Sequence, residues 1–190
     1  VIEQFNDPEI IIIDNQSTDE SMKVVSLFDK HNIVKHTING TYTPGKSINL
    51  GIQQCSNDTV LILSAHSQIT EIDMNWVEKG LTDHVAVFGN QTPIYKGKKI
   101  SKRYIWSHFT NDITENLYSD IEDRHFLHNA FCFYNKEFLI ENPMPEQYPG
   151  KEDRFWAKDL VESGMEYLYD PSIIVNHYWT SKGATWKGIG

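Results

Sequence analysis

Two adjacent acidic residues, Glu152 and Asp153, stand where the sequence best suits proton transfer. They begin a predicted helix over about residues 152–163, and Gly164 suits the position just after its end. The dipole of a first helical turn favours an ionised carboxylate, which can take a proton from a hydroxyl group. The alternative is structural, because acids are common in first turns and usually only complement the dipole.

A third carboxylate, Asp14, directly follows four isoleucines at residues 10–13. A short, fully apolar run is typical of a buried parallel strand, and open α/β sheets bind ligands where such strands end. A carboxylate at that place can accept hydrogen bonds from a nucleotide base or ribose, and nearby backbone N–H groups favour an anion. The alternative is an ordinary strand-to-helix turn rich in Asp and Asn.

The elements that would position these side chains alternate between strand and helix in the first half of the chain. Ser17 and Glu20 form a capping box, which predicts a helix starting at Ser17 with an apolar face that includes Val24 and Phe28. This β-α-β-α-β series predicts an open, mostly parallel sheet flanked by helices. We expect strands at residues 10–13, 33–38, 60–63, 85–88, 130–134 and 173–177, and helices at 46–55, 74–81, 136–141 and 152–163.

Composition excludes several classes of protein. A net charge of -9 is the opposite of the broad basic surface that coats nucleic acid. Cys55 and Cys132 sit among apolar neighbours, so two buried thiols are expected and no disulfide scaffold. No apolar run approaches the roughly 18 residues of a membrane span, and no signal peptide is visible. We therefore expect a soluble, cytoplasmic protein, which could still contact the inner face of a membrane peripherally.

Several segments, taken in order, resemble those of the large inverting GT-A glycosyltransferase family, family 2. The resemblance covers nearly the whole chain, and its strength lies in the ordered set. His177 fits the histidine that often ends the final strand of that family. The matching segments are residues 13–20 (IDNQSTDE), 44–52 (PGKSINLGI), 60–66 (VLILSAH), 88–93 (FGNQTP), 128–130 (HNA) and 149–158 (PGKEDRFWAK).

The resemblance implies a role for each of these segments. Asp14 would hold the nucleotide base or ribose, and Lys46 and Asn49 would lie near the nucleotide. Asp153, with Glu152 beside it, would be the general base that activates the acceptor hydroxyl. The expected donor is a nucleoside-diphosphate sugar, and the expected acceptor is a glycan or a lipid-linked molecule.

Metal use is the point on which this sequence departs from the family pattern. Ser64 and His66 belong to a Ser-Ala-His stretch that stands in place of the Asp-x-Asp motif, as in one bacterial subgroup. Hard cations such as Mg²⁺ and Mn²⁺ prefer oxygen ligands, and this stretch offers an imidazole and a hydroxyl instead. We expect weak or indirect metal binding, through the diphosphate with His66 and His177. Metal-free transfer, with lysine or arginine supplying positive charge, stays open.

The expected fold is a GT-A, Rossmann-like α/β domain over residues 1–190, with a nucleotide-binding part at 1–90 and an acceptor-side part at 91–190. The family's first strand has no counterpart before residue 10, so the chain is expected to be N-terminally truncated. A homodimer that exchanges a strand is one way to fill that place. The basic cluster Lys96, Lys98, Lys99, Lys102 and Arg103 is either a solvated loop or a contact for a diphosphate or an anionic acceptor.

Two rival functions follow from the same residues. One is a non-catalytic, degenerate GT-A module used for binding or assembly, which the absent Asp-x-Asp motif favours. The other is a nucleotidyltransferase, but the Gly-rich, basic loop expected of one is not seen near the N-terminus. We favour an enzyme that transfers a sugar with inversion, in bacterial surface polysaccharide or glycan synthesis.

Overall fold

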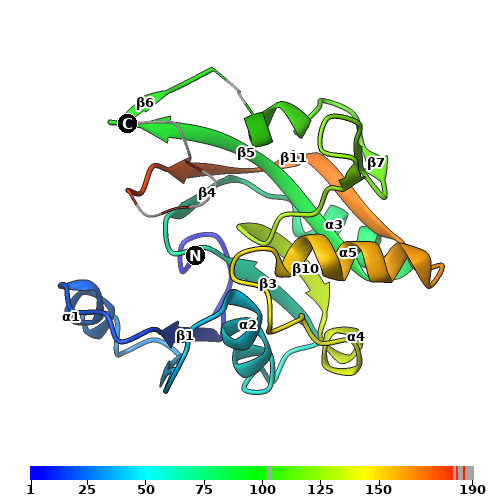
Figure 1. Cartoon of the computed structure of the whole chain (residues 1–190). Helices are drawn as coiled ribbons and strands as arrows, with labels where there is room; N and C mark the ends of the chain where they lie inside the picture. The colour runs from blue at the N-terminus through cyan, green and yellow to red at the C-terminus, as the bar shows by residue number, and fades with distance from the viewer. Residues whose placement is uncertain (102–103, 182, 184–185, 187–190) are drawn as a thin grey trace.

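The largest sheet in the computed structural model, which describes residues 1–101, 104–181, 183 and 186, takes its strands from both halves of the chain (Figure 1). It has seven strands, and the short β6 (Lys98–Lys99) and β7 (Thr114–Glu115) pair with two of the other five. Those five lie in the order β3 (Thr59–Leu63), β10 (Phe131–Asn135), β5 (Ala86–Tyr95), β11 (Tyr167–Tyr178) and β4 (Ser67–Glu71).

This sheet is mixed, which corrects the expectation of a mostly parallel one. β5 and β11 are parallel, whereas β10 runs antiparallel to β3 and β5, and β4 runs antiparallel to β11. The β-α-β rule predicts parallel neighbours only where a crossover joins two strands of one sheet. β10 is reached from β5 through η1 (Tyr104–His108) and the hairpin of β8 (Tyr118–Ser119) and β9 (Arg124–His125). An apolar run such as that of β10 does not indicate the direction of its strand, so the sequence could not show that β10 is antiparallel to its neighbours.

A second, smaller sheet holds β1 (Ile10–Asp14) and β2 (Ile33–Thr37), which are parallel as the sequence predicts. Within the described residues β1 pairs only with β2, and β3 pairs only with β10, so no strand joins the two sheets. Helix α2 (Pro44–Ile52) packs on β1, where a Cβ on Gly51 would stand 3.4 Å from Ile13 Cγ1. Strand exchange in a homodimer stays a prediction.

Helix α1 (Ser21–Ser26) begins later than the capping box at Ser17 predicts. The Ser17 N–H donates to the Asp14 carboxylate, and the chain turns at Gln16, whose φ is 55°. Ser17 is therefore part of the turn after β1, and the helix has Glu20 at its N-cap. None of its residues is buried, so the predicted apolar face does not pack into the core.

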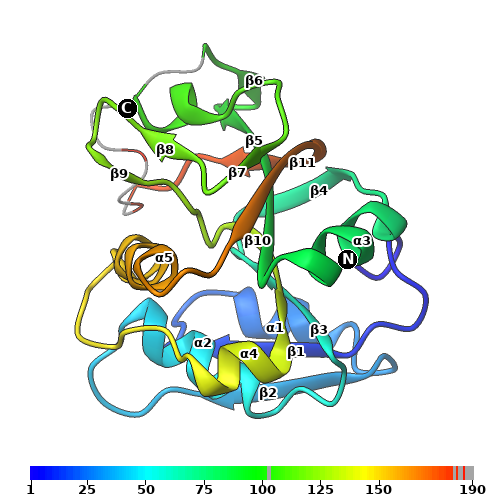
Figure 2. The same ribbon diagram turned by 90° about the vertical axis from the view of Figure 1, so that its right-hand side faces the viewer.

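Helices cover both faces of the large sheet, as Figure 2 shows for α3 (Met74–Asp83) and α5 (Glu152–Glu162). Side chains alternate along β5, so Phe88 belongs to the buried cluster that includes Trp156 of α5, whereas Val87 belongs to a second cluster with Val77 of α3. Helix α4 (Lys136–Glu141) follows β10 at the expected residues. The α/β class is thus confirmed, and both cysteines are free thiols.

Candidate active site

The first turn of α5 holds the two acids that the sequence marks as catalytic. Glu152 is only 5% exposed, and its Oε1 accepts a hydrogen bond of 3.4 Å from Asn129 Nδ2. Tyr134 in turn donates to Asn129 Oδ1 over 2.5 Å, which fixes the amide. Burial, and then the charge of Asp153, raise the pKa of Glu152 to about 7. Glu152 therefore faces the interior, and its Oε2 is buried without a hydrogen-bond partner among the described residues.

Asp153 is half-buried, and its Oδ1 accepts a hydrogen bond of 2.8 Å from the Arg154 backbone N–H. It lies near His128, whose pKa is lowered by burial while the Asp153 charge opposes that shift. Helix α5 begins at Glu152 after Lys151, which makes no side-chain cap. Asp153 is thus the more accessible carboxylate of the pair, near His128, which belongs to a cluster of histidines.

That cluster consists of His66, His128 and His177, and Gln91 hydrogen-bonds the last two of these rings. The His66 and His177 ring centroids are 4.6 Å apart, and those of His128 and His177 are 6.1 Å apart. The N–H of Ala130 points at His128 Nδ1, so that nitrogen must accept, and Gln91 Nε2 also donates to it over 3.1 Å. Gln91 Oε1 is then left to accept from His177 Nδ1, at 2.6 Å.

These hydrogen bonds fix the tautomer of His177. Because its Nδ1 carries the proton, its Nε2 presents a lone pair, and this atom is buried with no partner among the described residues. Burial lowers the pKa of His66, and burial together with the neighbouring histidines lowers the pKa of His177 to about 2. Both rings are therefore neutral at neutral pH, which is the state in which imidazole binds a metal.

The residues predicted to bind the nucleotide lie in different parts of the fold and have different hydrogen-bond partners. Ser64 and His66 form the turn between β3 and β4, which Tyr178 holds by donating its N–H to the His66 carbonyl over 2.9 Å. Asp14 lies at the end of β1, as predicted, and accepts from Ser17. Lys46 Nζ donates to the Thr41 carbonyl over 3.3 Å. Among the described residues, no hydrogen bond or ion pair joins Asp14 or Lys46 to the Ser64–His66 turn.

Asn49 is buried and tied to the loop that leads to α5. Its Nδ2 donates to the Met144 carbonyl over 2.9 Å and to Glu146 Oε1 over 3.0 Å, and its Oδ1 accepts from the Met144 N–H. Nearby, a Cβ on Gly45 would stand 2.4 Å from the Pro145 carbonyl oxygen, so only glycine fits there. The described contacts of Asn49 therefore hold this loop against α2, and contact with a nucleotide stays a prediction.

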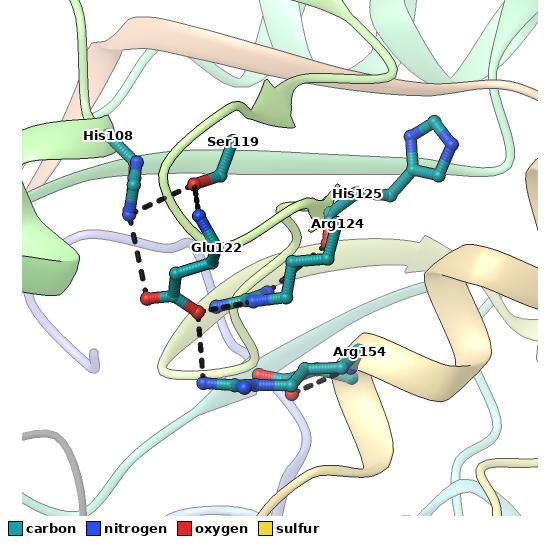
Figure 3. Close-up of polar contacts among 7 residues, drawn as sticks. His108, Ser119, Glu122, Arg124, His125 and Arg154 are labelled. Atoms are coloured by element: carbon teal, nitrogen blue, oxygen red, sulfur yellow. Dashed lines mark hydrogen bonds and ion pairs between the residues drawn. The ribbon is translucent and has the colours of Figure 1, made fainter.

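A charged network beside the first turn of α5 was not foreseen from the sequence (Figure 3). Glu122 Oε2 contacts Arg124 Nε at 2.6 Å and Arg154 Nη2 at 3.2 Å. Burial alone would raise the pKa of Glu122, but the Arg124 hydrogen bond and the charges of Arg124, Arg154 and His108 lower it overall. Residues 122–124 (EDR) are only a short polar string in the sequence, and their pairing with Arg154 depends on how α5 packs beside β9.

The predicted basic cluster lies elsewhere. Lys96 and Gly97, with φ values of 48° and 73°, form the turn of the β5–β6 hairpin, where Lys98 and Lys99 are exposed. The cluster's last two members, Lys102 and Arg103, lie outside the described residues.

His84, Glu115 and Glu166 form a separate group with metal-ligand geometry. Each offers one ligand atom, and these atoms lie within 4.8 Å of one another. Glu166 directly precedes β11, whereas His177 lies near the other end of that strand. Since a strand rises about 3.3 Å per residue, this group is far from the histidine cluster.

Comparison with known proteins identifies the family. The family model described as glycosyl transferase family 2 matches residues 1–142. The chain belongs to glycosyl transferase family 2. This family 2 chain is 26% identical over 171 residues to a Campylobacter jejuni protein named GalNAc(5)-diNAcBac-PP-undecaprenol beta-1,3-glucosyltransferase. The match covers 88% of this chain and 54% of the relative, so the chain spans about half the relative's length.

Solved structures share the GT-A fold. S. aureus TarS 1-349, in complex with UDP, has a TM-score of 0.66 and 17% identity, with 93% of this chain and 53% of that chain covered. GalNAc-T7 with UDP, GalNAc and Mn²⁺ has a TM-score of 0.65 and 13% identity, with 92% and 38% covered. In the described part of the family 2 chain, no helix is both long and apolar enough to span a membrane.

Proposed function

We propose that this chain is the GT-A part of an enzyme that moves a sugar from a nucleoside-diphosphate donor to a hydroxyl acceptor, with inversion, in bacterial surface polysaccharide or glycan synthesis. The observation that carries the proposal is the half-buried Asp153 at the start of α5, which lies close enough to His128 for its charge to act on that ring. Membership of family 2 and the name of the C. jejuni relative support it. The setting is the cytoplasm, with contact to the inner membrane face when the acceptor is lipid-linked.

The reaction assigns a task to each group. Asp153 takes the proton of the acceptor hydroxyl as its oxygen attacks the anomeric carbon. The bond from that carbon to the diphosphate breaks, and the nucleoside diphosphate leaves with the electron pair. Glu152, which is buried and hydrogen-bonded to Asn129, is the second candidate for the base, and its neighbourhood favours a positioning role.

The donor would occupy the region of residues 1–90, with Asp14, Lys46, Asn49, Ser64 and His66 around it, and residues 91–190 would form the acceptor side. Asp14 at the end of β1 has the position that suits a ribose or base. UDP is the first nucleotide to test, since both solved structures are complexes with UDP.

A divalent cation would fit between the diphosphate and His66 with His177. The observation that supports this fit is the buried Nε2 of His177, which has no partner in the described part of the chain. Gln91 orients the ring as an outer partner of a metal ligand does. A bound cation would stabilise the charge of the leaving diphosphate. Metal-free transfer is the alternative, with lysine or arginine supplying that charge.

Nucleotide binding is expected to raise the melting temperature. A ligand that binds only the folded state stabilises it by mass action, by about 2.7 kcal/mol at a concentration 100 times its Kd. The test is a thermal-shift panel with UDP, dTDP, GDP and CMP, each with and without Mn²⁺. A shift with one nucleotide supports the transferase, whereas no shift with any of them favours the non-catalytic module.

Replacing both His66 and His177 by alanine is expected to remove any enhancement of nucleotide binding by Mn²⁺. The two rings supply the metal ligands of the proposal, so the Kd for nucleotide should become the same with and without Mn²⁺ in a calorimetric titration. Circular dichroism would check that the variant is folded, because His177 is buried.

The matched control for the histidine pair is Glu115→Gln with Glu166→Gln. These exposed residues belong to the distant metal-like group, and removing their charges should leave the Mn²⁺ effect intact. Mn²⁺ enhancement that survives in the histidine variant but is lost in the glutamate variant would move the metal site to His84, Glu115 and Glu166.

A further inference from the structure

A pocket of about 420 Å³ lies between α5 and the β8–β9 hairpin, on the side of α5 where Figure 3 shows Arg154 meeting Glu122. Its wall includes Lys151, Arg154 and Lys158, which lie on both sides of Asp153 in the sequence. It also includes Arg124 of β9 and the ring of Phe155. Asp153 does not line the pocket itself, but it stands in the first turn of α5, between Lys151 and Arg154 in the sequence.

The charge of this pocket is opposite to that of the whole protein. The chain has a net charge of -9, yet the pocket wall carries four cationic side chains, Arg124, Lys151, Arg154 and Lys158, and only two acidic ones. Lys151 forms no ion pair with any described residue. Lys158 has one exposed partner, Glu162, at 3.7 Å. Because Arg124 and Arg154 both contact Glu122, Lys151 is the one cation of the pocket wall without a carboxylate partner among the described residues.

Glu122 holds the two guanidinium groups together. Arg124 and Arg154 both contact the same oxygen, Oε2, and that carboxylate is only 12% exposed. Arg124 is further fixed by donating from Nη1 to the His125 carbonyl and by lying 4.9 Å from the centroid of Phe126. A guanidinium has five N–H donors, so each keeps donors beyond those used on Glu122, and Arg154 is 34% exposed.

Two neighbouring guanidiniums with spare donors match the oxygens of a phosphate, which they can bind in a bidentate way. The start of α5, an 11-residue helix, adds the positive end of its dipole on the same side. None of the residues proposed for the donor lines the pocket, so the pocket is separate from the proposed donor site and available to the other substrate.

We propose that this pocket binds a phosphate or diphosphate group of the acceptor, and so presents the acceptor hydroxyl to Asp153. The proposal rests on the proposed function and narrows the acceptor to molecules that carry phosphate. The phosphate could come from a lipid diphosphate carrier or from a phosphorylated glycan, and both share the same chemistry at the pocket.

The test is a calorimetric titration of the whole chain with inorganic pyrophosphate. The nucleotide identified by thermal shift is present at a saturating concentration, and it is left out if no nucleotide binds. The Lys151→Gln, Arg154→Gln variant is expected to weaken pyrophosphate binding roughly tenfold or more, since each lost contact is a charge-assisted hydrogen bond. Lys98→Gln with Lys99→Gln removes the same charge from the exposed hairpin and should leave the Kd unchanged.

Equal weakening in both variants, or no pyrophosphate binding by the parent chain, would overturn the pocket assignment. Repeating the titration with geranyl diphosphate separates the two sources of phosphate. Tighter binding than pyrophosphate supports a lipid carrier, and equal binding supports a phosphorylated glycan. The chain could also bind pyrophosphate through Arg154 and yet bind no nucleotide. That result would support the assignment of this pocket as a phosphate site and contradict the proposed transferase function.

Discussion

Replacing Asp153 by asparagine is expected to lower kcat for sugar transfer by about 10²–10⁴-fold, the usual contribution of a general base. Asparagine cannot take the proton of the acceptor hydroxyl, but its side-chain oxygen can still accept the Arg154 N–H bond that Asp153 accepts at 2.8 Å. The start of α5 should therefore be preserved. The measurement is the rate at which nucleoside diphosphate is released from the donor, with the acceptor or water as the attacking group. The Kd for the nucleotide is measured in parallel and should not change.

Asp159→Asn is the matched control for Asp153→Asn. It makes the same change on the same helix, at an exposed position, and should leave kcat within about twofold, as expected for a surface substitution. Glu152→Gln decides between the two acids. If Glu152→Gln lowers kcat by about 10²–10⁴-fold while Asp153→Asn leaves kcat near the parent value, then the base is Glu152 and the assignment of Asp153 is wrong.

Local patterns in the sequence predicted the α-helices and six of the strands, but not β4 or the short strands β6–β9. The isoleucine run of β1, the residues of α4 and the position of Gly164 after α5 all follow from neighbours along the chain. Gly164 has φ 82°, a conformation that favours glycine at the end of a helix. The start of α1 was wrong because Asp14 takes the Ser17 N–H, and the sheet direction was wrong because no local signal records it.

The site could be predicted only where its residues lie in one segment. Glu152 with Asp153, and Ser64 with His66, are neighbours in the sequence, and the family resemblance points to both. The bond from Gln91 to His177 spans 86 residues, so it depends on the parallel register of β5 and β11. Gln91 and His128 lie within segments that resemble the family, and that was the one signal that could have marked them. The burial of Glu152 likewise depends on packing against Asn129, which no helical pattern reveals.

Replacing Glu152 by glutamine is expected to stabilise the protein progressively as the pH rises from about 4.5 to 7. Burial and the Asp153 charge raise the pKa of Glu152 from 4.5 to about 7, so in this range the folded protein keeps a proton that the unfolded chain has released. By linkage, the free energy of unfolding then falls as the pH rises, and it levels off above pH 7. The total loss is on the order of 3 kcal/mol at most. Glutamine does not titrate and can still accept from Asn129.

The comparison must be between the two proteins at each pH, because the histidines act in the opposite sense. Burial lowers the pKa of His66, His128 and His177, so their contribution to stability is lost as the pH falls below about 6.5. That contribution is common to both proteins and cancels in the difference. Urea unfolding from pH 5 to 8 would measure the difference. A difference that stays constant over this range would mean that Glu152 is ionised throughout, and that its carboxylate has a partner beyond Asn129.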